Sequence, residues 1–365
     1  MRHDGTDSST FTDSIFLPFT NDFSSKDVTR IRCSIESEMF HKMPLDTGST
    51  GTLIGAPILP HLDPTAGETA HHFFTSSRIL YVGRLVDLQI TFHADAGLNA
   101  TARVPVLIVD KSLHCPWYRP GTDSSECPPG PNGEEATERD TAKIAYMGVG
   151  FGRNRPSDGM PYAIPRINPF LNIDTIDGRP VSLTSFRPGY TVSSGGVHIG
   201  LTQENMHGFA FSDLQPGLTH SEDPRDWAMA AMCFRIDGGE VYCGTVLVDT
   251  GVSQMYIRPE QGGSIPNITI PNPIKQGYTK MVKRVKPGTE ITVAFPSLNR
   301  PVAGYSFVVG EGSDFEPDFV VPVSSTSSPY VNTGRNFLHG YSIAFDAVLG
   351  RFGFRPERST SSSVL

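Results

Sequence analysis

Asp-Thr-Gly stands once in each half of the chain, in the segments Leu45-Asp46-Thr47-Gly48-Ser49-Thr50 and Val248-Asp249-Thr250-Gly251-Val252-Ser253, and this repetition is the strongest indication of the fold. A single copy would be an ordinary turn in which the aspartate bonds nearby backbone. Two copies, each after an apolar lead-in, indicate a duplicated unit that brings two carboxylates face to face. Such carboxylates cannot both ionise cheaply and therefore share a proton, so the pair can act as acid and base.

A second repeated feature lies downstream of each copy. Residues 144–151 contain two apolar residues followed by Gly148, and residues 330–338 contain a related element around Gly334. Each half of the chain therefore pairs an Asp-Thr-Gly turn with a later glycine element, which supports an internal duplication.

The composition predicts an all-β protein. Glycine (36 residues) and proline (30 residues) are frequent, and periodic helical segments are scarce, which favours short strands and turns. Residues 223–232 are one candidate for a short helix. Strand-like runs are numerous, and the clearest are residues 85–92, 104–109, 197–201, 290–295 and 305–309.

These features resemble the pepsin-like aspartic peptidases. The resemblance rests on both Asp-Thr-Gly segments, on the Gly-Gly-Val-His-Ile-Gly stretch at 195–200 and on residues 336–354, and it spans roughly residues 14–356. It implies an all-β, bilobal double-barrel fold with minor helix and an active cleft between the lobes. The expected lobes are 14–215 and 216–356, with flexible tails at 1–13 and 357–365.

The resemblance also implies that Asp46 and Asp249 are catalytic and hold a water between them. The ionised carboxylate would take a proton from this water while the other polarises the substrate carbonyl. Around the dyad, Thr47 and Thr250 would each bond the backbone of the opposite loop. Gly48 and Gly251 would let backbone N–H groups point at the carboxylates.

The residue after each Asp-Thr-Gly makes the pair unequal. Ser49 can donate a hydroxyl hydrogen bond to Asp46, whereas its counterpart Val252 cannot donate to Asp249. We therefore expect the shared proton to rest mainly on Asp249 and the charge on Asp46.

Pepsin-like enzymes cover their substrate with a β-hairpin flap, and the matching stretch here is 73–83. Phe74 stands where the family has a tyrosine, or Tyr81 takes that role from a shifted hairpin. Ser77 and Arg78 replace the usual glycine turn, and Arg78 would offer a cation to an anionic substrate group. A solvent-exposed hairpin without a lid role is the alternative.

The net charge of −8 and the lack of a basic cluster beyond 280–286 exclude a nucleic-acid partner, and no run is long and apolar enough for a membrane helix. No Cys/His spacing suggests a metal, and we expect no cofactor. The expected protein is a monomer that binds a peptide or small-molecule substrate in the interlobe cleft.

Five cysteines leave two interpretations open. Pairing Cys115 with Cys127 and Cys233 with Cys243 would leave Cys33 over. The odd count and the absence of an apolar leader favour reduced thiols and a cytoplasmic protein. A secreted protein whose leader is missing from this sequence is the rival.

Three functions are compatible with the motifs. The first is an aspartic endopeptidase that activates water between Asp46 and Asp249. The second is a pepsin fold reused for acid/base chemistry on a small molecule, such as cyclisation, dehydration or isomerisation in a biosynthetic pathway. The third, an inactive binding protein, fits least because both Asp-Thr-Gly copies are intact.

Overall fold

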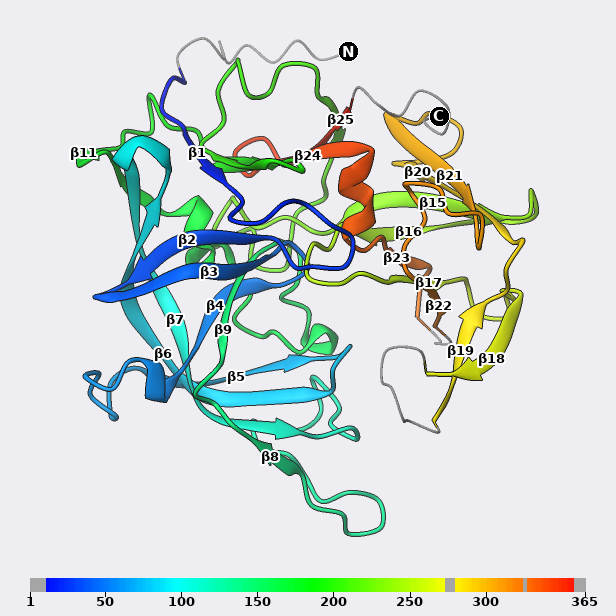
Figure 1. Ribbon diagram of the computed structural model, residues 1–365, viewed down its shortest axis with the longest axis horizontal. Helices are drawn as coiled ribbons and strands as arrows, with labels where there is room; N and C mark the ends of the chain where they lie inside the picture. Colours follow the sequence, from blue (N-terminus) through cyan, green and yellow to red (C-terminus); the bar gives the residue numbers. More distant parts are fainter. Residues whose placement is uncertain (1–10, 273–279, 324–326, 358–365) are drawn as a thin grey trace.

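The computed structural model describes residues 11–272, 280–323 and 327–357 as an all-β chain with two β bodies (Figure 1). The tails expected at 1–13 and 357–365 lie almost entirely outside the described residues. Of the five strand-like runs named above, 85–92, 104–109 and 290–295 lie wholly within strands, whereas 197–201 and 305–309 run one or two residues past the end of theirs.

The first body is a closed six-stranded barrel. Its strands follow the circuit β7-β4-β9-β3-β2-β6, and β6 pairs back to β7. They are β2 (Arg30–Ile35), β3 (Glu38–Asp46), β4 (Thr50–Gly55), β6 (Ile79–His93), β7 (Asn99–His114) and β9 (Ala145–Val149). The strands β5 (Glu68–Phe74), β8 (Thr137–Arg139), β10 (Ile173–Ile176) and β11 (Arg179–Pro180) extend this sheet.

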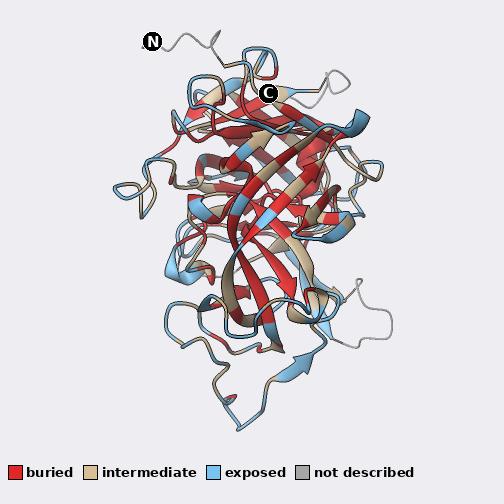
Figure 2. Ribbon diagram, turned by 90° about the vertical axis from the view of Figure 1, so that its left-hand side faces the viewer, coloured by how far each residue is buried: buried red, intermediate tan, exposed pale blue. Residues whose placement is uncertain are grey.

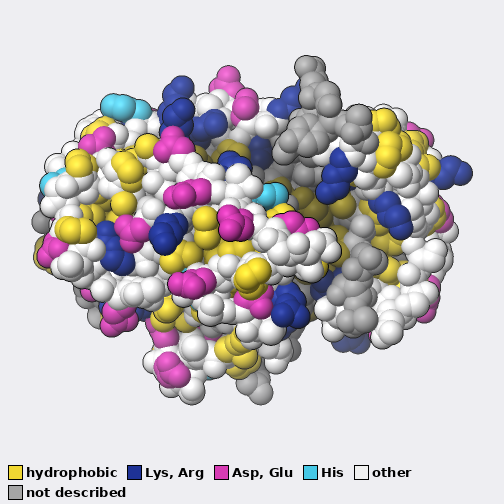
Figure 3. Space-filling model, turned by 90° about the horizontal axis from the view of Figure 1, so that it is seen from below, with side chains coloured by type: hydrophobic (Ala, Val, Ile, Leu, Met, Phe, Trp, Pro, Cys, Tyr) yellow, Lys and Arg dark blue, Asp and Glu magenta, His cyan; other side chains and the backbone are white. Residues whose placement is uncertain are grey.

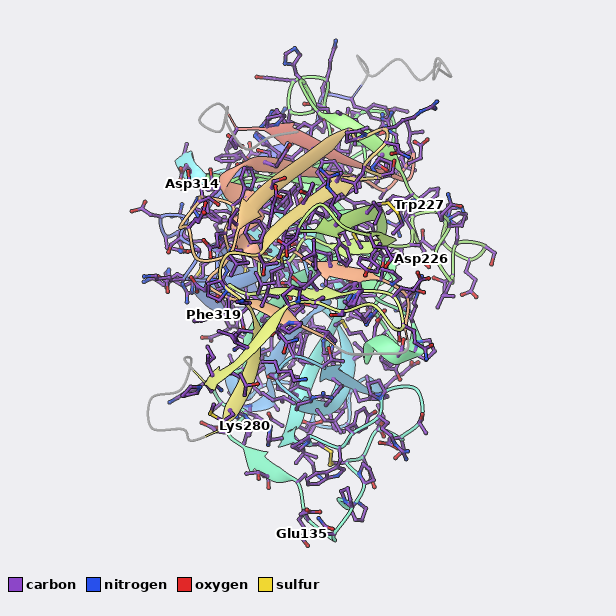
Figure 4. All side chains as sticks on the ribbon, turned by 90° about the vertical axis from the view of Figure 1, so that its right-hand side faces the viewer. Glu135, Asp226, Trp227, Lys280, Asp314 and Phe319 are labelled. Carbon is purple, nitrogen blue, oxygen red and sulfur yellow. A yellow bond between two sulfur atoms is a disulfide. The ribbon has the colours of Figure 1, made fainter. Side chains whose placement is uncertain are left out.

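The second body is a curled half-barrel of seven strands in the order β21-β20-β15-β16-β23-β17-β22. They are β15 (Ala230–Ile236), β16 (Val241–Leu247), β17 (Met255–Arg258), β20 (Glu290–Phe295), β21 (Ala303–Val308), β22 (Val320–Pro322) and β23 (Tyr330–Asn332). A separate hairpin, β18 (Asn267–Pro271) with β19 (Met281–Val285), stands at the edge of this body next to Lys280 (Figure 4).

A third sheet, drawn at the top of Figure 1, joins strands from both halves of the sequence. Its order is β1 (Ile15–Pro18), β13 (Gly196–Ile199), β12 (Gly189–Val192), β24 (Tyr341–Asp346), β25 (Arg351–Pro356) and β14 (Ala210–Asp213). Arg187 pairs with Asp346 at 2.5 Å, and both side chains are buried. This ion pair ties the chain entering β12 to the last residue of β24.

Alternation of apolar and polar residues explains the barrel strands. In β2 every second residue is buried, namely Ile31, Cys33 and Ile35, so one face of the strand supplies the core. In β24 all six residues are buried, because β12 and β25 pair with its two edges and other side chains pack on both faces. Figure 2 shows buried residues along the strands and exposed residues mainly in the loops.

The helix expected at 223–232 is wrong. Residues 224–225 form a turn, Trp227 forms an isolated β-bridge with Pro216, and β15 begins at Ala230 opposite Val246. The carboxylate of Asp226 accepts hydrogen bonds from Asn154 and from the amide and hydroxyl of Thr219, which hold the segment in turns. Helical structure in the described residues consists of short 3₁₀ turns: Ala56–Ile58, Asp95–Gly97, Pro156–Asp158, Pro165–Ile167, Pro169–Leu171 and Arg335–His339.

The expectation of reduced cysteines is also wrong. Disulfides join Cys115 to Cys127 and Cys233 to Cys243, and Cys33 is free and buried. Cys233 and Cys243 lie directly opposite each other because the β15–β16 hairpin turns through Asp237 and Gly238, both with positive φ. Cys115 and Cys127 close the base of an exposed excursion that reaches its far end near Glu135 (Figure 4).

Candidate active site

The two Asp-Thr-Gly turns meet where the barrel and the half-barrel adjoin. Asp46 ends β3 and is paired with Gly148 on β9, and the parallel pair β16–β23 matches Leu247 with Asn332. Continued by two residues, that second register sets Asp249 opposite Gly334. In each half of the chain, the aspartate therefore lies at or just after the end of a strand and next to the glycine of the downstream element.

The two threonines brace the turns against each other. The hydroxyl of Thr47 donates to the carbonyl of Val248 at 2.6 Å, and that of Thr250 donates to the carbonyl of Leu45 at 3.0 Å. Each threonine amide also donates to the other threonine's hydroxyl, in both cases at 3.1 Å. This is the crossed arrangement expected from the repeated Thr, and it locks the two loops together.

Backbone amides bring the two carboxylates to one point. The amide of Gly251 donates to Oδ1 of Asp46 at 3.1 Å and to Oδ1 of Asp249 at 2.8 Å, and the amide of Gly48 donates to Oδ1 of Asp46 at 2.6 Å. A Cβ on Gly48 would lie 2.3 Å from Cγ of Asp249, and one on Gly251 would lie 2.6 Å from Oδ1 of Asp46. Only glycine fits at either position.

The dyad is buried and electrostatically unequal. Asp46 is 3% exposed and Asp249 is 7% exposed. Burial, followed by the charge of Asp46, raises the pKa of Asp249 well above its usual range. The hydroxyl of Ser49 donates to Oδ2 of Asp46 at 2.7 Å. The direction agrees with the expectation that the proton rests on Asp249.

Two further donors were not anticipated from the sequence. The hydroxyl of Tyr146 donates to Oδ2 of Asp46, and Nδ2 of Asn332 donates to Oδ2 of Asp249 at 2.6 Å. Asp249 is therefore not short of a side-chain donor, although Val252 supplies none. Both residues lie two positions before the glycine of a downstream element, and a polar side chain there was the available signal.

The hairpin of β5 and β6 reaches the dyad through one aromatic contact. The centroid of the Phe74 ring lies 5.2 Å from that of Tyr146 in an edge-to-face arrangement, and 5.8 Å from that of Tyr81. Ser77 and Arg78 are exposed in the turn, where Arg78 adopts a positive φ and its amide donates to the Phe74 carbonyl.

Buried cations approach the dyad from other segments. Arg335 is 3% exposed, and its Nη2 donates to the Gly251 carbonyl at 3.0 Å. Arg153 is 7% exposed, and its Nη1 lies 3.8 Å from Oδ1 of Asp158. Both guanidinium charges act on Asp46 and Asp249.

Within the described residues, no group of three or more His, Cys, Asp or Glu side chains could hold a metal ion. The same part of the chain contains no helix of the length and apolar character needed to cross a membrane. The arrangement at Asp46 and Asp249 is suited to moving protons between two carboxyl groups and a bound molecule.

Comparison with known proteins assigns no family. No protein-family model matches the chain, and no curated protein is significantly similar to it. The functional argument therefore rests on the residues and their geometry.

Proposed function

We propose that this chain is a pepsin-like aspartic hydrolase that cleaves peptide bonds with Asp46 and Asp249. The two β bodies would be its lobes, residues 14–215 and 216–356, with the active cleft between them. In support, each body carries one Asp-Thr-Gly turn and one downstream glycine element in the same relation.

One observation carries the proposal: a single amide, that of Gly251, donates to Oδ1 of both Asp46 and Asp249. Two carboxyl groups that share one donor in a buried site cannot both be ionised cheaply, so one keeps its proton. Asp46 in its ionised form would take a proton from water, and protonated Asp249 would donate to the scissile carbonyl.

One face of the molecule is hollowed, and we propose that an extended substrate lies there. Seen from below, the molecule is hollowed to the right of its centre, and hydrophobic side chains line the hollow (Figure 3). The β5–β6 hairpin would cover a bound chain with Phe74 as its inner residue, because Phe74 already contacts Tyr146 at the dyad. Arg78, exposed in the hairpin turn, would contact substrate only from the outer side.

The test is cleavage of a diverse peptide library from pH 3 to 8, with and without a statine-type inhibitor. Asp46→Asn and Asp249→Asn should each lose cleavage by several orders of magnitude, since members of a catalytic unit do not substitute for one another. Matched Asp174→Asn, at an exposed position on β10, should retain activity. Inhibitor-insensitive cleavage that survives both dyad variants would refute the proposal.

The second candidate is acid/base chemistry on a small molecule, and Tyr146 favours it. A phenol on Asp46 adds a third proton-bearing group to the dyad and fills space beside it. Turnover of small molecules by a protein that cleaves no peptide, lost in both dyad variants, would support this candidate.

The two disulfides indicate the kind of cellular compartment in which the protein works. Disulfides persist in oxidising environments and are rare in the cytosol, so we propose an oxidising compartment in place of the cytoplasm. The proposed partner is a substrate alone, bound by a monomer without a cofactor.

A further inference from the structure

We propose that Tyr146 and Asn332 are paired positioning residues that assign unequal tasks to the dyad. Tyr146 holds the negative charge on Asp46, and Asn332 orients the carboxyl group of Asp249 so that its proton faces Asp46. The inference rests on the proposed function of the dyad and adds two residues to it.

The two residues occupy equivalent places in the two halves. Tyr146 lies two residues before Gly148 and Asn332 two residues before Gly334. In both halves this strand runs parallel to the strand that leads into the aspartate. The outcome is also equivalent, because each side chain donates to Oδ2 of the aspartate in its own half.

The amide of Asn332 can be oriented in only one way. Its Oδ1 accepts a hydrogen bond from the Gly334 amide at 2.9 Å, so its NH₂ group must face Asp249. An NH₂ group only donates, and it stabilises negative character on Oδ2. Oδ1 of Asp249 also has a donor, the Gly251 amide, but it shares that donor with Oδ1 of Asp46, whereas Oδ2 has the Asn332 donor to itself, so the proton of Asp249 is favoured on Oδ1.

The phenol of Tyr146 is likewise confined to the donor role. Burial, then the charges of Asp46 and Asp249, raise its pKa well above the usual range, so it stays protonated. Together with Ser49 and the amides of Gly48 and Gly251, it gives Asp46 four donors, whereas Asp249 has two. Four donors on one carboxylate favour the charge there.

Packing holds Tyr146 in place. Its ring meets Phe74 of the β5–β6 hairpin edge-on at 5.2 Å, and the strand that carries it is buried from Met147 onward. A movement of the hairpin would therefore shift the Tyr146 hydroxyl that donates to Asp46. The other ionisable side chains that act on the dyad, common to every variant below, are Arg153, Arg335, Tyr190, Tyr256 and Tyr330.

The experiment compares the wild type with Tyr146→Phe, Asn332→Leu and Phe74→Leu. Tyr341→Phe is the control, because Tyr341 is a buried tyrosine whose hydroxyl donates to the Gly304 carbonyl away from the dyad. Carboxyl carbons of ¹³C-labelled aspartate are followed by NMR over pH, with the dyad signals assigned from Asp46→Asn and Asp249→Asn. Melting curves establish that each variant is folded.

Loss of one hydrogen bond to a charged carboxylate should move a titration step by about one pH unit. Tyr146→Phe should raise the lower step of the pair, Asn332→Leu should raise the upper step, and Phe74→Leu should reproduce part of the Tyr146→Phe shift. The acid and alkaline limbs of the pH–rate profile should shift in the same direction as the lower and upper titration steps, respectively. The inference would be overturned if the titration steps of Tyr146→Phe and Asn332→Leu moved no further than those of Tyr341→Phe. It would also be overturned if these two variants moved the same step. The titration needs no turnover, so absence of peptide cleavage would count against the proposed function alone.

Discussion

The amide of Thr47 donates to the hydroxyl of Thr250, and the amide of Thr250 donates to the hydroxyl of Thr47, both over 3.1 Å. Each hydroxyl also donates to a carbonyl of the opposite turn. Four hydrogen bonds between these two buried hydroxyls and the backbone of the opposite turn link the two halves of the chain and also support the dyad.

Replacing either threonine by valine should destabilise the protein by about 1–3 kcal/mol, because buried donors and acceptors lose their partners. Thr47→Val and Thr250→Val together should cost less than the two single losses added, since both disrupt the same joint. Urea unfolding measures this, with Thr175→Val as the control at a half-exposed threonine pair. Additive losses would mean that the two hydroxyls act independently.

Alanine should not be tolerated at the dyad glycines. In Gly251→Ala the new Cβ would meet Oδ1 of Asp46 at 2.6 Å, and in Gly48→Ala it would meet Cγ of Asp249 at 2.3 Å. We expect losses of stability of about 1–3 kcal/mol from overpacking, with activity abolished. Gly195→Ala is the matched control, because its Cβ would have no neighbour closer than 3.8 Å. An active Gly251→Ala protein would contradict the geometry of the shared amide.

Stability should fall as the pH rises above about 4, owing to Asp249. The pKa of this carboxyl is raised in the folded state, mainly by burial and then by Asp46, above its ordinary value of 3.8. The folded state therefore binds the proton more tightly, and the resulting stability is complete below the unfolded pKa and lost as pH approaches the folded pKa.

Asp249→Asn should remove this pH dependence. Its stability relative to the wild type should rise with pH by up to about 1.4 kcal/mol per unit inside that window. Urea melts between pH 3.5 and 7 measure the difference, and Asp174→Asn should leave the wild-type slope unchanged. A wild-type slope that persists in Asp249→Asn would assign the effect to other groups.

Thiol counting tests the cysteine pairing. The unreduced protein should show no reactive thiol when native, because Cys33 is buried, and one when denatured. Reduction should release all five. Five thiols without reductant would restore the interpretation of reduced cysteines. The double variant Cys115→Ser with Cys127→Ser should lose about 3 kcal/mol, the value for closing a loop of similar length.

Much of the architecture was accessible from local patterns. The five apolar runs became strands because period-two alternation and β-branched residues are properties of the segment itself. The expectation failed at 223–232, where Asp226 bonds Thr219 and Asn154 and the following residues join a sheet. Sheet pairing and a contact from a distant segment override local helical preference there.

Local sequence was enough to predict that two aspartates stand in repeated turns, that glycine and threonine accompany them, and that Ser49 and Val252 make the turns unequal. Folding was needed to reveal that Tyr146 and Asn332 supply the remaining donors, that Arg335 and Arg153 rather than Arg78 carry the nearby buried charges, and that the cysteines pair. The difference arises from distance along the chain. A turn motif is written in adjacent residues, whereas a hydrogen bond between residues 46 and 146 depends on the register of β3 with β9.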